Sequence, residues 1–400
     1  MRDDCITITL GLPEVRVLRE EEGEHEILVE VQYRVARAEC PDCGQETRTV
    51  HDRRRQWKRD RRLRDKPVWL LLHKRRFRCG ACGTVFSEPN PVFGSRRRSS
   101  QRFRAYLGQE ALQQTIRHLA QREEVGEGLV RRCVTELAQT LLGTPAQAPP
   151  VRILGLDEFS IKKGQVYDTA LMDLERKQVV GVVSGHRQAE VQQFLETLPA
   201  PEQVVAVVMD MHEPFRQAVQ FCLPQAKVVA DKFHVLAHVH RALDQVRTSL
   251  QPQQGKRGEL FRARYLLLAA AERLTLEQRA RLEGLLARYP TLARAWALKE
   301  SFRQWYASPD RATATERLEA WEAEVRGQGP APFQRLFSML RDWRQEILNY
   351  FEHRYTNSFV EGKNNRIKVI KRLAYGYRNA QNFRQRILLT NVRVGEPRAA

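Results

Sequence analysis

The 400-residue sequence lacks any apolar run that approaches the ~18 residues of a membrane-spanning helix. Its beginning, MRDDCITITLGLP, also lacks the basic region and apolar core of a secretory signal. We therefore expect a cytoplasmic protein whose thiols stay reduced. The hydrophobic content of 42% predicts packed domains rather than a disordered chain.

Acidic residues are absent from one long stretch near the C-terminus. Glu361 is followed by residues 362–394, which contain no Asp or Glu. This stretch is one basic cluster, and residues 53–66 form a second, with nine basic residues against two acids. The formal net charge is +19, and its clustering favours nucleic acid as the partner. An anionic membrane surface fits less well, because neither cluster carries a long apolar face.

The isolated acid Glu361 has two interpretations. Ser358 and Glu361 fit a capping box, in which a hydroxyl and a carboxylate satisfy the free amides at a helix start. A Glu in the first turn also suits the helix dipole. The alternative is that Glu361 holds a metal ion beside bound DNA. The local sequence leaves both open, and the two roles are compatible.

Four of the seven cysteines form two C-x-x-C pairs, Cys40 with Cys43 and Cys79 with Cys82. Two thiolates of one turn can reach the same ion, and a second pair completes a tetrahedral zinc site. A reducing compartment argues against disulfides. We expect a zinc ribbon in which one structural Zn²⁺ fixes the fold and places the arginine-rich segment against phosphates.

The segment between the two cysteine pairs is longer than in compact zinc ribbons. It contains two histidines that could replace a cysteine ligand, His51 and His73. The three remaining cysteines are single, and we interpret them as ordinary core or surface thiols: Cys5, Cys133 and Cys222.

Short periodic segments predict the elements of the N-terminal third. Alternating apolar and polar residues predict strands over residues 5–10 and 25–35. Apolar residues spaced by three and four predict helices over residues 100–142, with a break near Gly126. The second helix would begin near Glu127 and carry Arg131 and Arg132, as in a helix-turn-helix, although a plain helical hairpin fits equally. A linker then follows at residues 143–150.

The middle of the chain predicts a sheet with acids at its strand ends. The element order β-β-β-α-β-α-β-α suggests a mixed five-stranded sheet with helices packed against it. Asp210 and Asp231 directly follow the fourth and fifth apolar strands, and Asp157 ends the first apolar run. One acid at a strand end is usually a turn residue. Three of them in a basic protein leave two interpretations open, separate turn residues or a shared site, since site residues concentrate there in α/β sheets.

The region after this sheet contains no sharp catalytic motif. His234 and His238 lie four residues apart on one predicted helix face, but the glutamate of an H-E-x-x-H metalloprotease motif is absent. Residues 251–341 have helical periodicity. Their tryptophans are interpreted as core residues rather than as DNA-stacking platforms: Trp296, Trp305 and Trp321.

Together these motifs resemble the DDE transposases of the bacterial ISL-three insertion-sequence family, and the resemblance covers nearly the whole chain. It rests on the cysteine pairs with HKRRFRCGACGTVFSE, on GLDEFSIKKG, on VVMDMHEPFRQAV and VVADKFHV, and on YTNSFVEGKNNRIKVIKRLAYGYRN. The last stretch is the most specific.

The resemblance implies an α/β ribonuclease-H-like core with an all-helical insertion, preceded by a zinc ribbon and a helix-turn-helix-like DNA-binding region. The catalytic residues would be Asp157, Asp210 and Glu361, which would hold two Mg²⁺ or Mn²⁺ ions, with Asp157 bridging them. Asp231 and His234 would support the site. Asp231 is also the replacement if Asp210 is not the second catalytic aspartate.

The implied partners are double-stranded DNA, as terminal inverted repeats and target DNA, and a second copy of the chain when two ends are held together. The expected location is the bacterial cytoplasm, in association with the nucleoid. Basic residues of three segments are expected to contact DNA: Arg53, Arg54, Arg55, Lys58, Arg59, Arg61 and Arg62; Arg131 and Arg132; and Lys363, Arg366, Lys368, Lys371 and Arg372.

The expected domains follow the motifs. They are a zinc ribbon (1–95), a helix-turn-helix-like region with its linker (96–148), the first part of the core (149–250), a helical insertion (251–344) and the last part of the core (345–400). Two other functions fit part of the same pattern. One is a zinc-ribbon DNA-binding regulator with an inactive core, and the other is a structure-specific nuclease on the same core.

Overall fold

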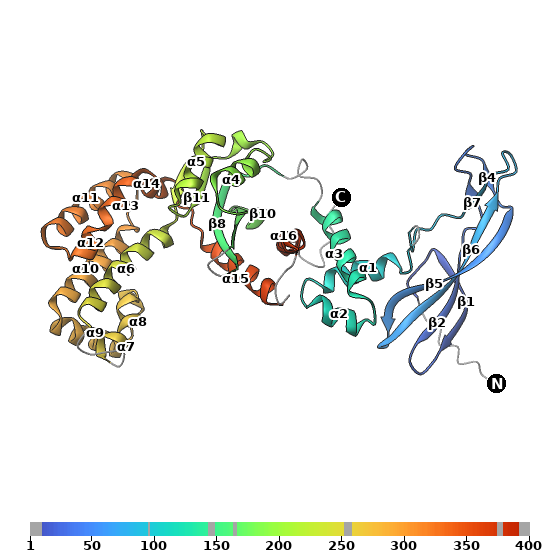
Figure 1. Ribbon diagram of the computed structural model, residues 1–400, viewed down its shortest axis with the longest axis horizontal. Helices are drawn as coiled ribbons and strands as arrows, with labels where there is room; N and C mark the ends of the chain where they lie inside the picture. Colours follow the sequence, from blue (N-terminus) through green and yellow to red (C-terminus); the bar gives the residue numbers. More distant parts are fainter. Residues whose placement is uncertain are drawn as a thin grey trace. The chain divides into compact units, whose positions relative to one another are not determined.

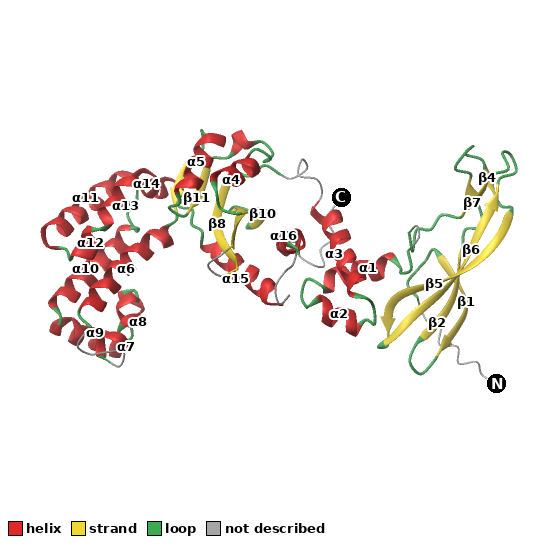
Figure 2. Ribbon diagram, viewed as in Figure 1, coloured by secondary structure: helices red, strands yellow, loops and turns green. Residues whose placement is uncertain are grey.

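The computed structural model describes residues 10–94, 97–142, 149–162, 166–251, 258–373 and 379–391. The chain divides into two compact units, residues 1–142 with 373–400 and residues 143–372. Figure 1 labels the elements, and Figure 2 separates strands from helices. Each unit contains its own sheet and its own helices.

The first unit is built on a sheet with one apolar face. Its strands follow the order β1 (Val15–Glu22), β2 (Ile27–Tyr33), β6 (Lys66–Arg78) and β5 (Val50–Leu63), and β7 (Val85–Ser87) also pairs with β6. Alternate side chains of β2 and β6, such as Val29 and Leu70, form a buried core with Phe93. The strand predicted over residues 25–35 is confirmed. The one predicted over residues 5–10 lies outside the described residues, apart from Leu10.

A two-residue turn joins β5 to β6. Arg64 and Asp65 have φ values of 51° and 61°, and Leu63 pairs with Lys66 across the turn. Positive φ at both central residues marks a type I′ turn, whose twist matches that of the two strands. β5 is the edge strand of this sheet. A small ribbon of β3 (Ala38–Glu39) and β4 (Glu46–Thr47) carries the first cysteine pair.

The helices described in the first unit pack together although one of them comes from the far end of the chain. They are α1 (Gln101–Glu110), α2 (Ile116–Arg122), α3 (Glu127–Leu142) and α16 (Ala380–Leu388). Leu389 joins the apolar core of α1 to α3, and the Arg386 guanidinium donates to the carbonyl oxygen of Gln114 at 2.8 Å. Residues 379–391 therefore pack with the first unit, whereas we expected residues 345–400 to complete the second.

The turn before α3 has no glycine at its left-handed position, which is why a helix-turn-helix and a plain helical hairpin fitted the sequence equally. Glu124, and not a glycine, takes the left-handed conformation, with φ of 54°. The N–H of Val125 donates to the carbonyl oxygen of Ala120, as in a Schellman motif. The helix predicted from Glu127 is confirmed. The helix expected before it is split in two, because Thr115 caps a new helix, α2.

The second unit contains all five predicted strands, in the order β10-β9-β8-β11-β12. Their bounds are β8 (Ile153–Lys162), β9 (Val166–Asp173), β10 (Gln178–Ser184), β11 (Ala206–Met209) and β12 (Lys227–Ala230). β9 is antiparallel to both of its neighbours, while β8, β11 and β12 run parallel. The sheet is therefore mixed, as predicted.

Helices cover this sheet and continue as a long helical segment. α4 (Gln188–Leu195) and α5 (Glu213–Cys222) pack on one face, sharing a core with Leu154, Leu156 and Met209. α6 (Lys232–Ser249) leads into the segment, which comprises α7 (Glu259–Arg262), α8 (Arg264–Leu268), α9 (Leu276–Arg288), α10 (Pro290–Trp305), α11 (Arg311–Gln328), α12 (Ala331–Gln334) and α13 (Leu336–Asp342). α14 (Arg344–His353) and α15 (Ser358–Leu373) return the chain to the sheet.

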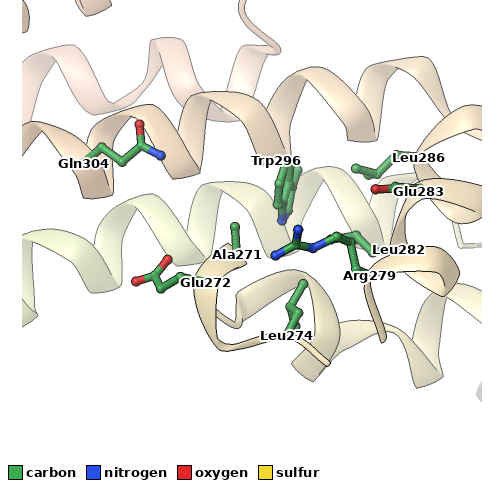
Figure 3. Close-up of a pocket in the computed structure, with 9 residues that line it drawn as sticks. All are labelled: Ala271, Glu272, Leu274, Arg279, Leu282, Glu283, Leu286, Trp296 and Gln304. Carbon is green, nitrogen blue, oxygen red and sulfur yellow. The ribbon is translucent and has the colours of Figure 1, made fainter. Parts of the chain in front are cut away.

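Two of the three tryptophans in the helical segment are core residues, as predicted. The indole N–H of Trp305 donates to the carbonyl oxygen of Ala314 at 2.7 Å, and that of Trp321 donates to Leu298 at 3.0 Å. Trp296 differs, because it is only half-buried and lines a pocket of about 440 Å³ with Arg279 and apolar side chains of α9 (Figure 3).

No helix in the described part of the chain is both long and apolar enough to cross a membrane.

Candidate active site and zinc centre

Strand register brings three aspartates into one row at the edge of the second sheet. Met209 of β11 pairs with Leu156 of β8 on one side and with Ala230 of β12 on the other. Each of these three residues is followed directly by an aspartate: Asp157, Asp210 and Asp231. Because the three strands are parallel, the acids lie level with one another in adjacent positions, Asp210 and Asp231 just after β11 and β12 and Asp157 within β8.

Asp231 is the most buried of the three and is fully engaged by the protein. Its side chain is 1% exposed. The backbone N–H of Asn357 donates to Oδ1 at 2.9 Å, and Nδ1 of His234 lies 3.0 Å from Oδ2. Both oxygens are therefore committed to holding α6 and the chain entering α15. This arrangement favours Asp231 as a supporting residue and leaves Asp210 as the better candidate for a catalytic carboxylate.

His234 links Asp231 to Asp210. Its Nδ1 lies 2.6 Å from Oδ1 of Asp210, and ligand atoms of the three residues all lie within 4.8 Å of one another. The carboxylate of Asp210, followed by that of Asp231, raises the pKa of His234 to about 10. The His234 imidazolium therefore forms an ion pair that holds Asp210 in place.

Asp157 is held by α15, the helix that contains Glu361. The side-chain amide of Asn364 donates to Oδ2 of Asp157. Burial, and then the negative charge of Asp210, raise the pKa of Asp157 to about 7. Two carboxylates that repel each other in a partly buried place favour the binding of a cation between them.

Glu361 lies in the first turn of α15, but its side chain is outside the described part, as is that of Ser358. Described residues on either side fix where this turn lies. Asn357 donates from its backbone to Asp231 and from its side-chain amide to the carbonyl oxygen of Leu156 at 3.2 Å. Asn364 contacts Asp157. Because Asn364 comes three residues after Glu361 in α15, the two positions lie on the same face of the helix.

The structure thus brings together Asp157, Asp210, Asp231 and His234, with the backbone of Glu361 in the adjoining helix turn. Asn357 and Asn364 were not predicted as site residues. Both are buried, at 3% and 6% exposure. The sequence shows only that these asparagines lie on either side of Glu361. It does not distinguish them from Asn365, which is exposed.

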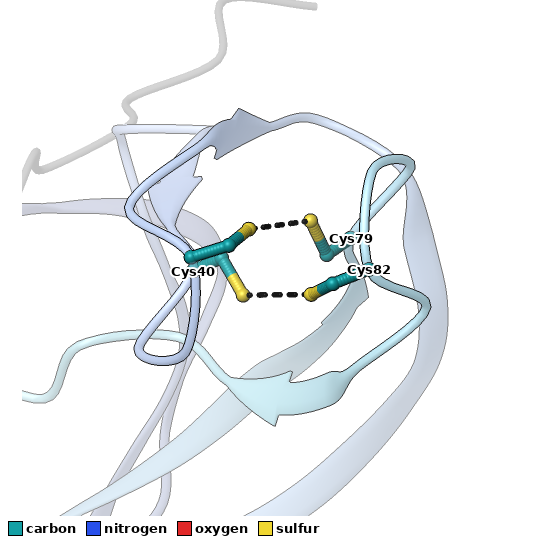
Figure 4. A group of neighbouring side chains, drawn as sticks. Cys40, Cys79 and Cys82 are labelled. Atoms are coloured by element: carbon teal, nitrogen blue, oxygen red, sulfur yellow. Dashed lines mark hydrogen bonds between the residues drawn. The ribbon is translucent and has the colours of Figure 1, made fainter.

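The four predicted cysteine ligands form a cluster in the first unit. Sγ of Cys40 lies 3.5 Å from that of Cys82, and Sγ of Cys43 lies 3.5 Å from that of Cys79 (Figure 4). A disulfide would need about 2.05 Å. Four thiolates around a tetrahedral zinc, with Zn–S bonds of about 2.3 Å, have sulfur atoms roughly 3.8 Å apart. The donor set and spacing therefore fit a structural Zn²⁺.

The substitute ligands considered for this site are not part of the cluster. Nε2 of His73 lies 2.8 Å from Oε2 of Glu30 on the neighbouring strand, and His51 is an exposed residue of β5. Of the single cysteines, Cys133 is buried and Cys222 is half-buried, as ordinary thiols are, while Cys5 lies outside the described residues.

Two of the basic residues predicted to contact DNA are buried instead. Lys58 and Arg59 are each 4% exposed. Lys58 donates to the carbonyl oxygen of Arg97. Arg59 donates to that of Glu123 at 3.1 Å and lies over the ring of Trp69. These side chains tie β5 to the chain around α1 and α2, so the expectation that they contact phosphates is wrong for this conformation.

The other predicted DNA contacts remain at least partly accessible. Arg62, Lys363 and Lys371 are half-buried, and Lys371 donates to the carbonyl oxygen of Ser160 at 3.2 Å. The exposed residues are Arg53, Arg54, Arg55, Arg61, Arg131, Arg132, Arg366, Lys368 and Arg372. They lie on β5, α3 and α15, where contact with DNA stays a prediction.

Comparison with known protein families decides the class of the protein. Residues 154–387 match the family model of the ISL3 group of DDE transposases, described as "Transposase". The chain belongs to the ISL3 family of transposases. Residues 36–82, which contain the four clustered cysteines, match the "zinc-finger of transposase IS204/IS1001/IS1096/IS1165". Membership of this family indicates, in general terms, an enzyme that binds and cleaves DNA.

Two relatives are similar to the chain over more than half of its length. The transposase is 29% identical over 356 residues to the transposase for insertion sequence element IS1001 of Bordetella parapertussis, with 86% of each chain covered. It is 28% identical over 269 residues to the transposase for insertion sequence element IS1557 of Mycobacterium tuberculosis, with 60% of each chain covered.

We predict that replacing Asp231 by Asn destabilises the second unit. The buried carboxylate accepts from Asn357 and His234, and an amide in its place presents N–H donors to one of these donors. We expect the free energy of unfolding to fall by about 1–3 kcal/mol, measured by urea denaturation. The exposed Asp342→Asn is the control, with a change within about 0.5 kcal/mol. Equal unfolding midpoints for both variants would remove Asp231 from its supporting role.

Proposed function

We propose that this transposase binds the terminal inverted repeats of its insertion sequence and carries out DNA cleavage and strand transfer with Asp157, Asp210 and Glu361. The observation that carries the proposal is the contact between Asn364 and Asp157. It supports the placement of the helix turn bearing Glu361 beside the row of aspartates, although Asn364 and Asp157 lie 207 residues apart in the sequence.

The sheet supports a ribonuclease-H-like core. Its strand order by sequence is 3-2-1-4-5, with the second strand antiparallel to the first and the last two parallel to it. In this interpretation, residues 251–344 are a helical insertion between the sheet and the helix of Glu361.

The donor set fits two divalent cations. Carboxylate oxygens are the ligands that Mg²⁺ and Mn²⁺ prefer, and Asp157 has partners for a cation on both sides, Asp210 and the turn of Glu361. Asp157, Asp210 and Glu361 would hold two such ions, and the chemistry that these would supply is activation of an attacking water or 3′-hydroxyl and stabilisation of the leaving oxygen in an in-line displacement. No serine or tyrosine nucleophile of the chain is then required.

The remaining side chains position the carboxylates. Asn364 holds Oδ2 of Asp157 through its side-chain amide. His234 holds Asp210 at 2.6 Å, and Asp231 in turn holds both His234 and the chain that enters α15. These contacts preorganise the acids, because three carboxylates without them would move apart under their mutual repulsion.

In this proposal, exposed cations of each unit contact DNA. Arg53, Arg54 and Arg55 lie on β5, Arg131 and Arg132 on α3, and the basic residues after Glu361 on α15. Contacts of this kind fix register on the duplex without reading bases. Holding two transposon ends at once requires two copies of the chain, so we propose at least a dimer on DNA.

We predict that the double variant Arg53→Ala, Arg54→Ala weakens DNA binding by an electrostatic mechanism. A plot of log K against log salt concentration has a negative slope, and each lost phosphate contact makes this slope shallower by about 0.9. Fluorescence anisotropy over a salt series measures this slope. Arg341→Ala, which removes an exposed guanidinium from the helical segment, is the control. A slope unchanged from that of the control would remove these arginines of β5 from the interface.

A strand-transfer assay with Mg²⁺ and DNA carrying the ends of the element tests the function as a whole. We expect cleavage at the ends followed by joining to a target duplex. Binding without cleavage would instead indicate a DNA-binding regulator with an inactive core. Cleavage that ignores the terminal repeats and prefers branched or single-stranded DNA would indicate a structure-specific nuclease.

A further inference from the structure

Trp57 is a large apolar side chain of the first unit that is exposed to solvent. It lies on the edge strand β5 and is 50% exposed. Its strand partner is Leu71 of β6. The sheet core lies on the opposite face, because the β6 residues that form it, Leu70 and Leu72, alternate with Leu71. Trp57 therefore points away from the core.

Arginines share this face with Trp57. Arg53 and Arg55 precede it by four and two residues, so their side chains project on the same side of the strand. Both are exposed. Across the hairpin, Arg55 pairs with His73. From Arg53 to Trp57 the strand rises about 13 Å, which is close to the ~12 Å width of the major groove of DNA.

The rest of the strand shows that exposure of Trp57 is not a general property of β5. Two residues later, Arg59 is covered by the chain of the helices, with its guanidinium over the rings of Trp69 and Phe103. At this end of β5 a cation is thus buried against aromatic rings of β6 and α1, whereas Arg53, Arg55 and Trp57 at the other end are exposed. The open end carries the charge: Arg53, Arg54 and Arg55 are consecutive and exposed.

An indole ring among exposed guanidinium groups fits a partner that offers negative charge and flat apolar surface together. Duplex DNA has both, as phosphates along the groove rims and as bases and sugars within. An acidic protein surface would match the charge. It would not by itself explain why a large aromatic ring is left exposed at the end of a row of exposed guanidinium groups.

We propose that the face of β5 formed by Arg53, Arg55 and Trp57 enters a groove of duplex DNA, with the Trp57 ring contacting bases or sugars while the arginines contact phosphates. The proposal rests on the DNA binding put forward under the proposed function. It adds an apolar contact to an interface that otherwise consists of charges, and it assigns that contact to the β5–β6 hairpin.

The test is a salt series with a labelled duplex taken from the end of the element and a mixed-sequence duplex of the same length. Trp57→Ala weakens binding roughly 5- to 100-fold at every salt concentration and leaves the slope against log salt unchanged, because no phosphate contact is lost. Arg55→Ala makes the negative slope shallower by about 0.9. Trp57→Phe, which keeps a ring, retains most of the affinity.

The control is Phe221→Ala, which removes another exposed ring, 72% exposed, from α5 in the second unit. It leaves binding unchanged. Zinc content and the unfolding midpoint check that the Trp57 variants are folded, as expected for a residue outside the core. If wild-type protein binds neither duplex, the proposed function itself is wrong.

If wild-type protein binds DNA and Trp57→Ala binds equally well at every salt concentration, only the present proposal is overturned. The same holds if Trp57→Ala keeps its affinity for DNA but loses self-association in sedimentation equilibrium, which would assign this face to a protein interface.

Discussion

Asp157→Asn yields a folded transposase that binds DNA and does not cut it. The amide keeps the shape of the carboxylate and its place beside Asn364 but removes the negative charge that holds a divalent cation. We expect the rate of end cleavage in Mg²⁺ to fall on the order of 1000-fold or more. The measurement is cleavage of a labelled terminal duplex, with binding followed by anisotropy in the same buffer.

Asp210→Asn and Glu361→Gln should lose cleavage to the same extent, since each removes one carboxylate from a set that acts as a unit. Asp310→Asn, which changes an exposed helix-capping carboxylate in the helical segment, is the control and should cleave normally. Full cleavage by Glu361→Gln would contradict the proposed role. Glu361 would then be a residue that stabilises the start of α15 and does no more.

Cys79→Ser should release the zinc of the first unit. A serine hydroxyl is not deprotonated at neutral pH, so three thiolates would remain where a closed tetrahedral site needs four ligands. We expect the zinc content to fall from about one ion per chain to nearly none, and DNA affinity to fall at least tenfold as the two cysteine turns lose their common anchor. Elemental analysis of the purified protein and anisotropy measure the two effects.

Cys222→Ser is the matched control, because this half-buried thiol lies in the second unit and outside the cysteine cluster. It should keep its zinc and its affinity for DNA. A Cys79→Ser protein that retains one zinc per chain would show that the ion is bound at a site other than the four cysteines. If the Cys79→Ser protein retained its zinc but no longer bound DNA, the loss of DNA binding would have a cause other than the loss of zinc.

The sheet of the second unit was predictable because its strands are short apolar runs between clear turns. Parallel strands end at one edge, so acids that follow them must meet, and Asp210 and Asp231 could be assigned to a common site from their positions alone. Asp157 was harder to place. It ends an apolar run, yet β8 continues to Lys162, and only the register of Leu156 with Met209 shows that it is level with the other acids.

The side-chain partners at this edge could not be predicted. Asn357 and Asn364 contact Asp231 and Asp157 across more than 100 residues of sequence, and no local pattern distinguishes a buried amide from an exposed one. The same limit explains the error at Lys58 and Arg59. A run of basic residues fixes the net charge of a strand, but burial depends on which neighbours cover it, here the chain around α1 and α2.

The C-terminal boundary also depended on tertiary contacts. The basic composition after Glu361 is continuous, so the sequence offers no reason to end the core before residue 400. Packing of α16 on α3 assigns residues 379–391 to the first unit. In the same way, the turn between α2 and α3 was obscured because Glu124 occupies a left-handed position where glycine is the usual residue.

Anomalous scattering from crystals grown with Mn²⁺ and a transposon-end duplex tests the central claim most directly. The account predicts manganese peaks within coordination distance of carboxylate oxygens from Asp157, Asp210 and Glu361, with Asp157 contacting each ion. Manganese bound at other acids, with the Glu361 carboxylate turned back onto the amides at the start of its own helix, would contradict it.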